Sequence, residues 1–165
     1  MKNGALWPRF FETSSRMVYI KEREREMRIV QEVITISTRG HNDIQDLTPE
    51  VERRLEASGL KEGQALVFVQ GSTAGVTTME YEPGLVRDLP ELLEKLVPSN
   101  RSYHHDETWG DANGFSHLRA SLLGPSLMVP FAGGRLQLGT WQQIVLVDFD
   151  NRPRSRNVLL QFVGE

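Results

Sequence analysis

The sequence predicts a single α+β domain, and three observations lead to this class. Its 165 residues are enough for one hydrophobic core and too few for two ordinary domains. Runs of β-branched and aliphatic residues are interspersed with stretches in which the apolar residues have helical spacing. From Leu127 onward, only strands and turns are predicted.

The composition excludes several classes of protein. The chain has no cysteine, which rules out disulfides, a thiolate nucleophile and sulfur-ligated metal. A formal net charge of -3 argues against a nucleic-acid-binding protein. No apolar run approaches the roughly 20 residues of a membrane span, and the N-terminus lacks the apolar stretch of a secretory signal. We therefore expect a cytoplasmic protein that binds neither nucleic acid nor membranes.

Residues 1–28 differ in composition from the rest and are treated as an N-terminal extension, with residues 29–165 as the domain. The extension holds seven basic residues against four glutamates. Its end, Lys21 to Arg28, alternates charge without an apolar face, which is typical of a solvated segment. The aromatic residues before it, Trp7, Phe10 and Phe11, are candidates to anchor it to the surface.

The first elements of the domain are a strand and a helix. Val33–Ser37 has β-branched strand character and is followed by a loop at Gly40–Asp43. Thr48, followed by a proline, is the expected N-cap of a helix that buries Val51 and Leu55 and is ended by two glycines.

The next segment is predicted as strand, break, strand and helix. Ala65–Val69 is an apolar strand, and the small residues of Gly71–Gly75 interrupt it before Val76–Thr78 resumes. Leucines and valines at helical spacing run from Pro83 to Val97, where Pro90 implies either two helices or one kinked helix.

A further helix is expected over Gly114–Leu123, with Asn113 as its N-cap. Its predicted buried stripe consists of Phe115, Leu118 and Leu122. His117 falls on a neighbouring face with small residues, which would let another element approach the imidazole.

Four strands complete the prediction: Leu127–Val129, Arg135–Leu138, Gln142–Phe149 and Asn157–Val163. Hairpin turns are expected between them at Ala132–Gly134 and Asp150–Pro153. Ile144–Val147 does not alternate, so that strand is expected to be covered on both faces, by helices or by another subunit.

Three of the four histidines, His104, His105 and His117, fall in one short stretch together with Asp106, Glu107 and Asp111. Imidazole binds divalent metals and titrates near neutral pH, so this cluster favours metal or acid–base chemistry. The alternative is an ordinary polar loop, because no His-x-x-x-His or Cys-x-x-Cys spacing is present.

Two further segments are candidates for phosphate binding. Gly71–Gly75 could bind phosphate through backbone N–H groups and the hydroxyls of Ser72 and Thr73, but it lacks the P-loop lysine, and a bulge or tight packing is the alternative. Alternate arginines, at positions 152, 154 and 156, would point to one side of an extended chain, either as a phosphate fork or as a solvated edge.

Several motifs together resemble the YjbQ family, in order from about Val33 to the C-terminus. They are Gly71-Ser-Thr-Ala-Gly-Val, Tyr103-His-His-Asp, Ser116-His-Leu-Arg-Ala-Ser-Leu-Leu-Gly-Pro-Ser126, Gly134-Arg-Leu-Gln-Leu-Gly-Thr-Trp-Gln142 and Gln161-Phe-Val-Gly-Glu165. The resemblance implies a pseudo-barrel of mixed or antiparallel sheet with packed helices. It also implies a homotrimer with the site near subunit boundaries.

The resemblance implies thiamine-phosphate synthase activity, joining an aminopyrimidine diphosphate to a thiazole phosphate. The expected catalytic residues are Glu80, His105, His117 and Arg119. The expected ligands of the small phosphorylated substrate are Ser72, Thr73, Thr140, Gln142, Arg154 and Arg156. His105 and His117 are also the candidate ligands for a divalent metal, zinc or magnesium.

The chain departs from the family pattern at three positions. Gly71 and Phe115 stand where many members carry histidine, and Met79 stands where many carry asparagine. The loss of possible ligands leaves two alternatives to the transferase. One is a metal-dependent hydrolase of a small phosphorylated or acyl compound. The other is a non-catalytic trimer that binds a small anion.

Overall fold

The computed structural model describes residues 26–165. The expected anchors Trp7, Phe10 and Phe11, and most of the charged segment after them, lie outside the described residues. The helices are α1 (Thr48–Ser58), α2 (Leu85–Leu96), α3 (His104–Trp109) and α4 (Gly114–Leu123). The strands are β1 (Arg28–Thr38), β2 (Asp43–Asp46), β3 (Gly63–Gln70), β4 (Ala74–Met79), β5 (Ser126–Ala132), β6 (Arg135–Leu136), β7 (Gln143–Asp148) and β8 (Arg154–Gly164).

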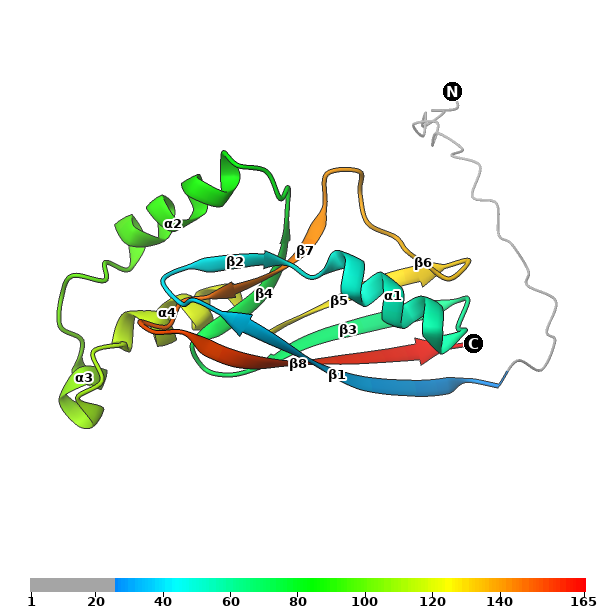
Figure 1. Cartoon of the computed structure of the whole chain (residues 1–165), viewed down its shortest axis with the longest axis horizontal. Helices are drawn as coiled ribbons and strands as arrows, with labels where there is room; N and C mark the ends of the chain where they lie inside the picture. Colours follow the sequence, from blue (N-terminus) through cyan, green and yellow to red (C-terminus); the bar gives the residue numbers. More distant parts are fainter. Residues whose placement is uncertain (1–25) are drawn as a thin grey trace, which may run out of the picture.

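The strands form two antiparallel sheets. The large sheet has the order β1-β8-β3-β5-β6, and the small sheet has the order β2-β7-β4. Figure 1 shows the large sheet curling beneath the small one, with α1 against the sheets near the chain's C-terminus and α2 standing off at the other side. This half-barrel with four helices confirms the predicted α+β class.

The core lies between the two sheets and α1. It includes Val51 and Leu55 of α1 together with apolar residues of β3, β7 and β8. On β7, Ile144 and Leu146 join this core, whereas Val145 and Val147 join a second cluster with residues of α2 and α4. The prediction that this strand is covered on both faces is confirmed, and helices of the same subunit supply the second cover.

The start of α1 differs from the prediction. The helix begins at Thr48, and no side chain caps it, so Thr48 is not the N-cap. Instead, the Thr48 hydroxyl accepts a hydrogen bond from Ile144 N at 2.8 Å, and the backbone N–H of Thr48 donates to Asp46 Oδ1 at 2.8 Å. The hydroxyl is thus used to join the helix to β7.

Helix α2 runs through Pro90 as one element. Its start is held by Glu82, whose carboxylate accepts hydrogen bonds from Gly84 N at 2.7 Å and from Leu85 N. These two backbone bonds hold the pKa of Glu82 below its usual value.

Helix α4 confirms the predicted range but not the predicted buried stripe. Phe115 is buried, whereas Leu118 is 46% exposed and Leu122 is 64% exposed. The buried side also contains Ser116, Arg119 and Ala120. Helical periodicity identified an apolar face but could not tell a core contact from a surface that this subunit leaves open.

One connection was also mispredicted. Asp150–Pro153 is not a hairpin turn, because β7 pairs with β2 and β4 while β8 pairs with β1 and β3. The segment instead carries the chain from the small sheet to the large one. The segment that holds His104 and His105, for which an ordinary polar loop was one alternative, forms helix α3. Its start is held by Asp106 Oδ2, which accepts a hydrogen bond from Tyr103 N at 2.9 Å.

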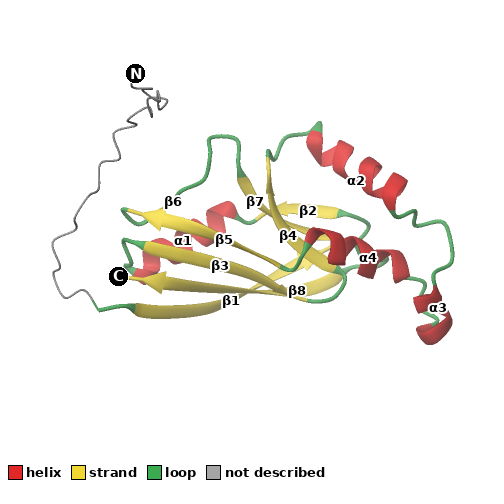
Figure 2. Cartoon of the chain, turned by 180° about the vertical axis from the view of Figure 1, so that it is seen from behind, coloured by secondary structure: helices red, strands yellow, loops and turns green. Residues whose placement is uncertain are grey.

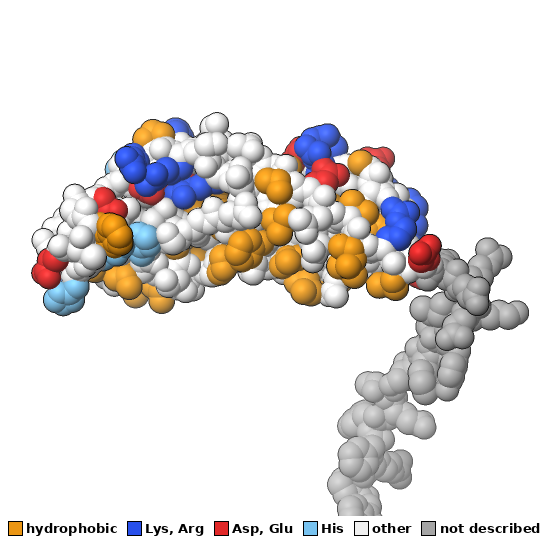
Figure 3. All heavy atoms as spheres, turned by 90° about the horizontal axis from the view of Figure 1, so that it is seen from below, with side chains coloured by type: hydrophobic (Ala, Val, Ile, Leu, Met, Phe, Trp, Pro, Cys, Tyr) orange, Lys and Arg blue, Asp and Glu red, His pale blue; other side chains and the backbone are white. Residues whose placement is uncertain are grey.

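The outer face of the large sheet carries apolar side chains that no described element covers. Ile29 and Val33 of β1 and Met128 of β5 are each at least half exposed. The register sets Val33, Leu159 and Phe68 side by side across three strands. Figure 3 shows hydrophobic side chains gathered in a band along the molecule in the view from below. Contiguous apolar patches of this kind are typical of interaction surfaces.

Candidate functional site

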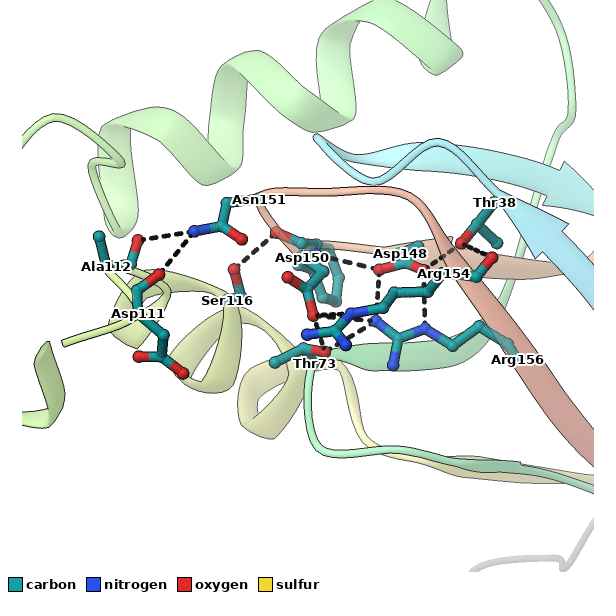
Figure 4. Close-up of polar contacts among 11 residues, drawn as sticks. Thr38, Thr73, Asp111, Ala112, Ser116, Asp148, Asp150, Asn151, Arg154 and Arg156 are labelled. Carbon is teal, nitrogen blue, oxygen red and sulfur yellow. Dashed lines mark hydrogen bonds and ion pairs between the residues drawn. The ribbon is translucent and has the colours of Figure 1, made fainter. Parts of the chain in front are cut away.

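Three segments meet at one end of the two sheets: the β3–β4 turn, the start of α4 and the β7–β8 connection. Figure 2 shows α4 lying across this end, next to α3. The Asn151 amide donates to Asp111 O at 2.8 Å, and Ser116 Oγ donates to Phe149 O at 2.7 Å. These bonds fix the start of α4 against the β7–β8 connection (Figure 4).

The histidine cluster resolves into a pair and an outlier. The ring centroids of His105 and His117 are 4.2 Å apart, with the rings tilted by 46°. His105 Nε2 lies 3.7 Å from Asp111 Oδ1. His104 is fully exposed on the other side of α3. The structure therefore brings together the two histidines that the family resemblance selects.

His117 has a pKa below its ordinary value of 6.5. Burial is the main cause, because it disfavours the charged imidazolium, and the neighbouring His105 acts in the same direction. Asp111 and Asp150 partly oppose this lowering. His117 is therefore poised to be neutral near pH 7, as a proton acceptor must be.

Two arginines of β8 converge on two buried aspartates. Arg156 donates to both oxygens of Asp148 at 2.7 Å and to Thr73 Oγ1 at 2.7 Å. Arg154 Nε and Thr73 Oγ1 donate to Asp150 Oδ2 at 2.8 and 2.9 Å. Burial raises the pKa of Asp150, but these hydrogen bonds outweigh it and hold the pKa below its usual value.

The two guanidinium groups keep unused donors. No described residue accepts a hydrogen bond from either Nη atom of Arg154 or from Nη1 of Arg156. Arg156 Nη1 lies against Gly71, where an added Cβ would be 3.0 Å from it. The aspartates thus fix both guanidinium groups. The Arg154 side chain is 32% exposed, so its unused donors are accessible to an anion, whereas the Arg156 side chain is only 9% exposed.

A shallow cavity of about 410 Å³ opens beside this network. It is lined by Gly71 and Ser72 of the β3–β4 turn, by His117, and by small residues that include Ala120 and Ser121. Small side chains around His117 therefore do admit the turn of a neighbouring element, as the sequence predicted. The start of β4 packs tightly against the end of α4, since a Cβ at Gly75 would lie 2.8 Å from Gly124 O.

Arg119, a predicted catalytic residue, has its donors occupied by the protein. It is fully buried and donates to Val97 O, Asn42 Oδ1 and Glu94 Oε2 at 2.5 to 3.0 Å. Its guanidinium also lies 5.0 Å from the centroid of the Phe115 ring. Arg119 thereby ties α4 to the end of α2, a structural role that uses four of its five N–H donors; the fifth, on Nη1, belongs to a side chain that is only 1% exposed.

The remaining candidates lie at the opposite end of the small sheet. Glu80 follows β4, and Thr140 and Gln142 precede β7, whereas the cavity lies at the start of β4 and the end of β7. A strand of this length separates the two groups by roughly 20 Å. Gln142 Nε2 donates to Thr78 Oγ1 at 3.1 Å, and the neighbouring Trp141 is 71% exposed.

The residues do not fit a protein-held metal ion. Nowhere in residues 26–165 do three or more His, Cys, Asp or Glu side chains converge as a metal site would require. His105 and His117 are in ring contact, and the carboxylate near them is that of Asp111, 3.7 Å from His105 Nε2. Neither Asp148 nor Asp150 was among the predicted site residues, although their Asp-Phe-Asp alternation directly after an apolar strand was a usable signal.

Comparison with known proteins decides the family. The family model described as "UPF0047 protein YjbQ-like" matches residues 32–165. The chain belongs to the YjbQ-like UPF0047 family. A UPF0047 protein of Archaeoglobus fulgidus is 41% identical over 128 residues, covering 78% of this chain and 97% of that protein. The YugU protein of Bacillus subtilis is 32% identical over 132 residues, with 79% and 97% covered.

Solved structures of this family share the fold. A YbjQ-like protein of unknown function from Sulfolobus solfataricus superposes with a TM-score of 0.81 at 34% identity, covering 85% of this chain and all of that one. A hypothetical protein from Aeropyrum pernix gives a TM-score of 0.77 at 34% identity, with 82% and 99% covered. None of the helices in residues 26–165 has the length and apolar character that crossing a membrane requires.

Proposed function

We propose that the protein binds the phosphate groups of a small molecule at the cavity beside Ser72 and His117. The observation that carries this proposal is the pair of anchored guanidinium groups of Arg154 and Arg156, each with unused N–H donors. Fixed guanidinium groups bind phosphate well because little side-chain entropy remains to be lost. The hydroxyl of Ser72 adds a further donor at the cavity wall.

The reaction that best uses this site is the transfer expected of a thiamine-phosphate synthase. The bond between the pyrimidine methylene and its diphosphate oxygen would break, and the thiazole nitrogen would form a new bond to that methylene carbon. Pyrophosphate leaves with the bonding electrons, and Arg154 and Arg156 would stabilise its growing charge. Neutral His117 would line the same cavity and orient a bound substrate as a hydrogen-bond acceptor, because the transfer itself releases no proton.

We also propose that the protein acts as a homotrimer. Two observations support an assembly: the uncovered apolar face of the large sheet, and the separation between the two groups of candidate residues. In an assembly, Glu80, Thr140 and Gln142 of one subunit could complete the cavity of its neighbour. The exposed Trp141 would then lie in the interface, where large aromatic residues are enriched.

The test is turnover of the two precursors by the purified full-length chain, measured as formation of thiamine phosphate and pyrophosphate. We expect Arg154→Gln to reduce turnover strongly, because it replaces the charged guanidinium by a shorter, neutral amide while keeping a polar side chain. Arg152→Gln is the matched control, since Arg152 is exposed and outside the network. Equal turnover by both variants, or no product from the wild type, would reject the transferase.

A further inference from the structure

Strand β1 forms one edge of the large sheet, and no strand within residues 26–165 pairs with its outer side. It pairs with β8 along its whole length, from Arg28 opposite Gly164 to Thr38 opposite Arg154. Figure 1 and Figure 2 both show β1 at the border of the sheet. A strand of 11 residues therefore has one free side.

The hydrogen bond of Gln45 shows which backbone groups face the free side. Its side-chain amide donates to Ser37 O at 2.9 Å, and Gln45 belongs to β2 of the other sheet. The carbonyl of Ser37 thus points away from β8. Because backbone groups alternate along a strand, the N–H and C=O groups of the odd-numbered residues from Ile29 to Thr35 point the same way. Within residues 26–165, no hydrogen bond is made to these groups.

This edge lacks the features that usually prevent a free edge from pairing. Such features are a lysine or proline on the edge, a bulge, or a short strand. The register of β1 with β8 has no bulge, and β1 contains neither lysine nor proline. Its two charged residues, Arg28 and Glu32, bind Ser58 O and Arg54 of α1. An unprotected edge of this length calls for a partner strand.

The chain itself carries a segment of strand composition close to this edge in the sequence. Met17-Val-Tyr-Ile20 combines β-branched and aromatic residues, as strands do. Seven residues, from Lys21 to Met27, connect it to the start of β1. The family model begins at residue 32, so the segment lies outside the part of the chain that the family shares.

We propose that Met17–Ile20 adds to the free edge of β1 as an antiparallel strand and thereby extends the large sheet. A connection of seven residues is long enough to reverse the chain between two paired strands. The added strand bonds to the outward backbone groups at the start of β1, and it leaves the outer face of the sheet open to another subunit. The proposal is independent of the phosphate site, which lies at the other end of β8, at Arg154 and Arg156.

Backbone amide exchange, measured by NMR on the full-length chain, tests this strand residue by residue. In the wild type, the outward amides of Ile29 and Gln31 should exchange slowly. In the double variant Val18→Pro, Tyr19→Pro, they should exchange at least about 10-fold faster, because neighbouring N–H groups point in opposite directions and one of the two must face β1. The amides of Val30 and Glu32, which face β8, should stay slow and show that the variant is folded.

The double variant Thr13→Pro, Ser14→Pro is the matched control, and it should leave Ile29 and Gln31 slow. Fast exchange of these two amides in the wild type would overturn the proposal, and this measurement needs no variant. Slow exchange that survives Val18→Pro, Tyr19→Pro would overturn it as well, because a second copy of the chain would then cover the edge. Equal acceleration in both proline variants would also count against Met17–Ile20 as the partner strand.

Discussion

His105 and His117 are in tilted ring contact, with centroids 4.2 Å apart, because α3 packs directly on the first turn of α4. A Cβ at Gly114 would lie 2.6 Å from the Cβ of Tyr103, so only glycine allows this approach. Asp106 Oδ1 closes the contact by accepting a hydrogen bond from Gly114 N at 2.9 Å. Two imidazoles at this separation repel each other when both are charged.

The lowered pKa of His117 predicts a stability that depends on pH. Below the ordinary histidine value of 6.5, the unfolded chain binds a proton that the folded chain resists, so stability falls as the pH drops through this range. Thermal unfolding should show a Tm that falls as the pH is lowered from about 8 to 5. This fall in Tm should be smaller in His117→Gln.

His104→Gln is the control for this measurement, because His104 is fully exposed. Asp43 and Asp150, whose pKa values are also lowered, act only near and below the usual carboxyl range of about 4. If the Tm of the wild type and that of His117→Gln depended on pH in the same way, this would contradict the lowered pKa of His117.

Gly71 of the β3–β4 turn and Gly75 of β4 should respond differently to alanine. At Gly75, the added Cβ would meet a backbone carbonyl at 2.8 Å, so Gly75→Ala should destabilise the fold by about 1–3 kcal/mol. At Gly71, the Cβ would meet only the end of the Arg156 side chain, at 3.0 Å. Gly71→Ala should therefore change stability little and weaken pyrophosphate binding, as measured by denaturation and calorimetry. A Gly71→Ala protein that is less stable than Gly75→Ala would contradict the packing described around these two glycines.

Arg119→Ala should destabilise the protein. It removes both hydrogen bonds to Val97 O, and the orphaned carbonyl alone costs about 1–3 kcal/mol. Arg152→Ala, an exposed change, is the control for urea denaturation. Arg119→Lys should recover part of the loss, because it restores the charge but not the planar fork. Full stability of Arg119→Ala would contradict the structural role.

The sequence was most informative where a local pattern determined the structure. The continuous apolar run at Ile144–Val147 indicated a strand covered on both faces, and Gly114–Leu123 was predicted as a helix at its observed bounds. The prediction failed where partners are distant in the chain. Leu118 and Leu122 have core-like spacing, but their exposure depends on what packs around α4.

The arginine site shows the same limit. Alternation correctly indicated that Arg154 and Arg156 project together, but it wrongly included Arg152, which precedes β8 and is exposed outside the network. The anchoring by Asp148 and Asp150 arises because β7 and β8 belong to different sheets. No pattern in the sequence predicts that the chain passes from the small sheet to the large sheet between β7 and β8. The family resemblance supplied the list of candidate residues, and the fold separated them into two groups at opposite ends of the small sheet.

The proposed homotrimer predicts that a charge on the outer face of the large sheet causes dissociation. Val33→Lys would place an ammonium group in the row shared with Leu159 and Phe68, at a cost of several kcal/mol if that row is buried between subunits. Analytical ultracentrifugation should show a trimeric wild type and a smaller Val33→Lys species. Glu52→Lys, on the exposed side of α1, is the control and should remain trimeric. A monomeric wild type would contradict the proposal.

The most direct test of the phosphate-binding account is calorimetric titration of the full-length protein with pyrophosphate. The wild type should bind, and Arg154→Gln should weaken binding by about 10- to 100-fold, the loss expected for charge-assisted hydrogen bonds of about 1.5–3 kcal/mol. Arg152→Gln should bind like the wild type. Equal affinity in the wild type and Arg154→Gln, or no binding by the wild type, would contradict the account.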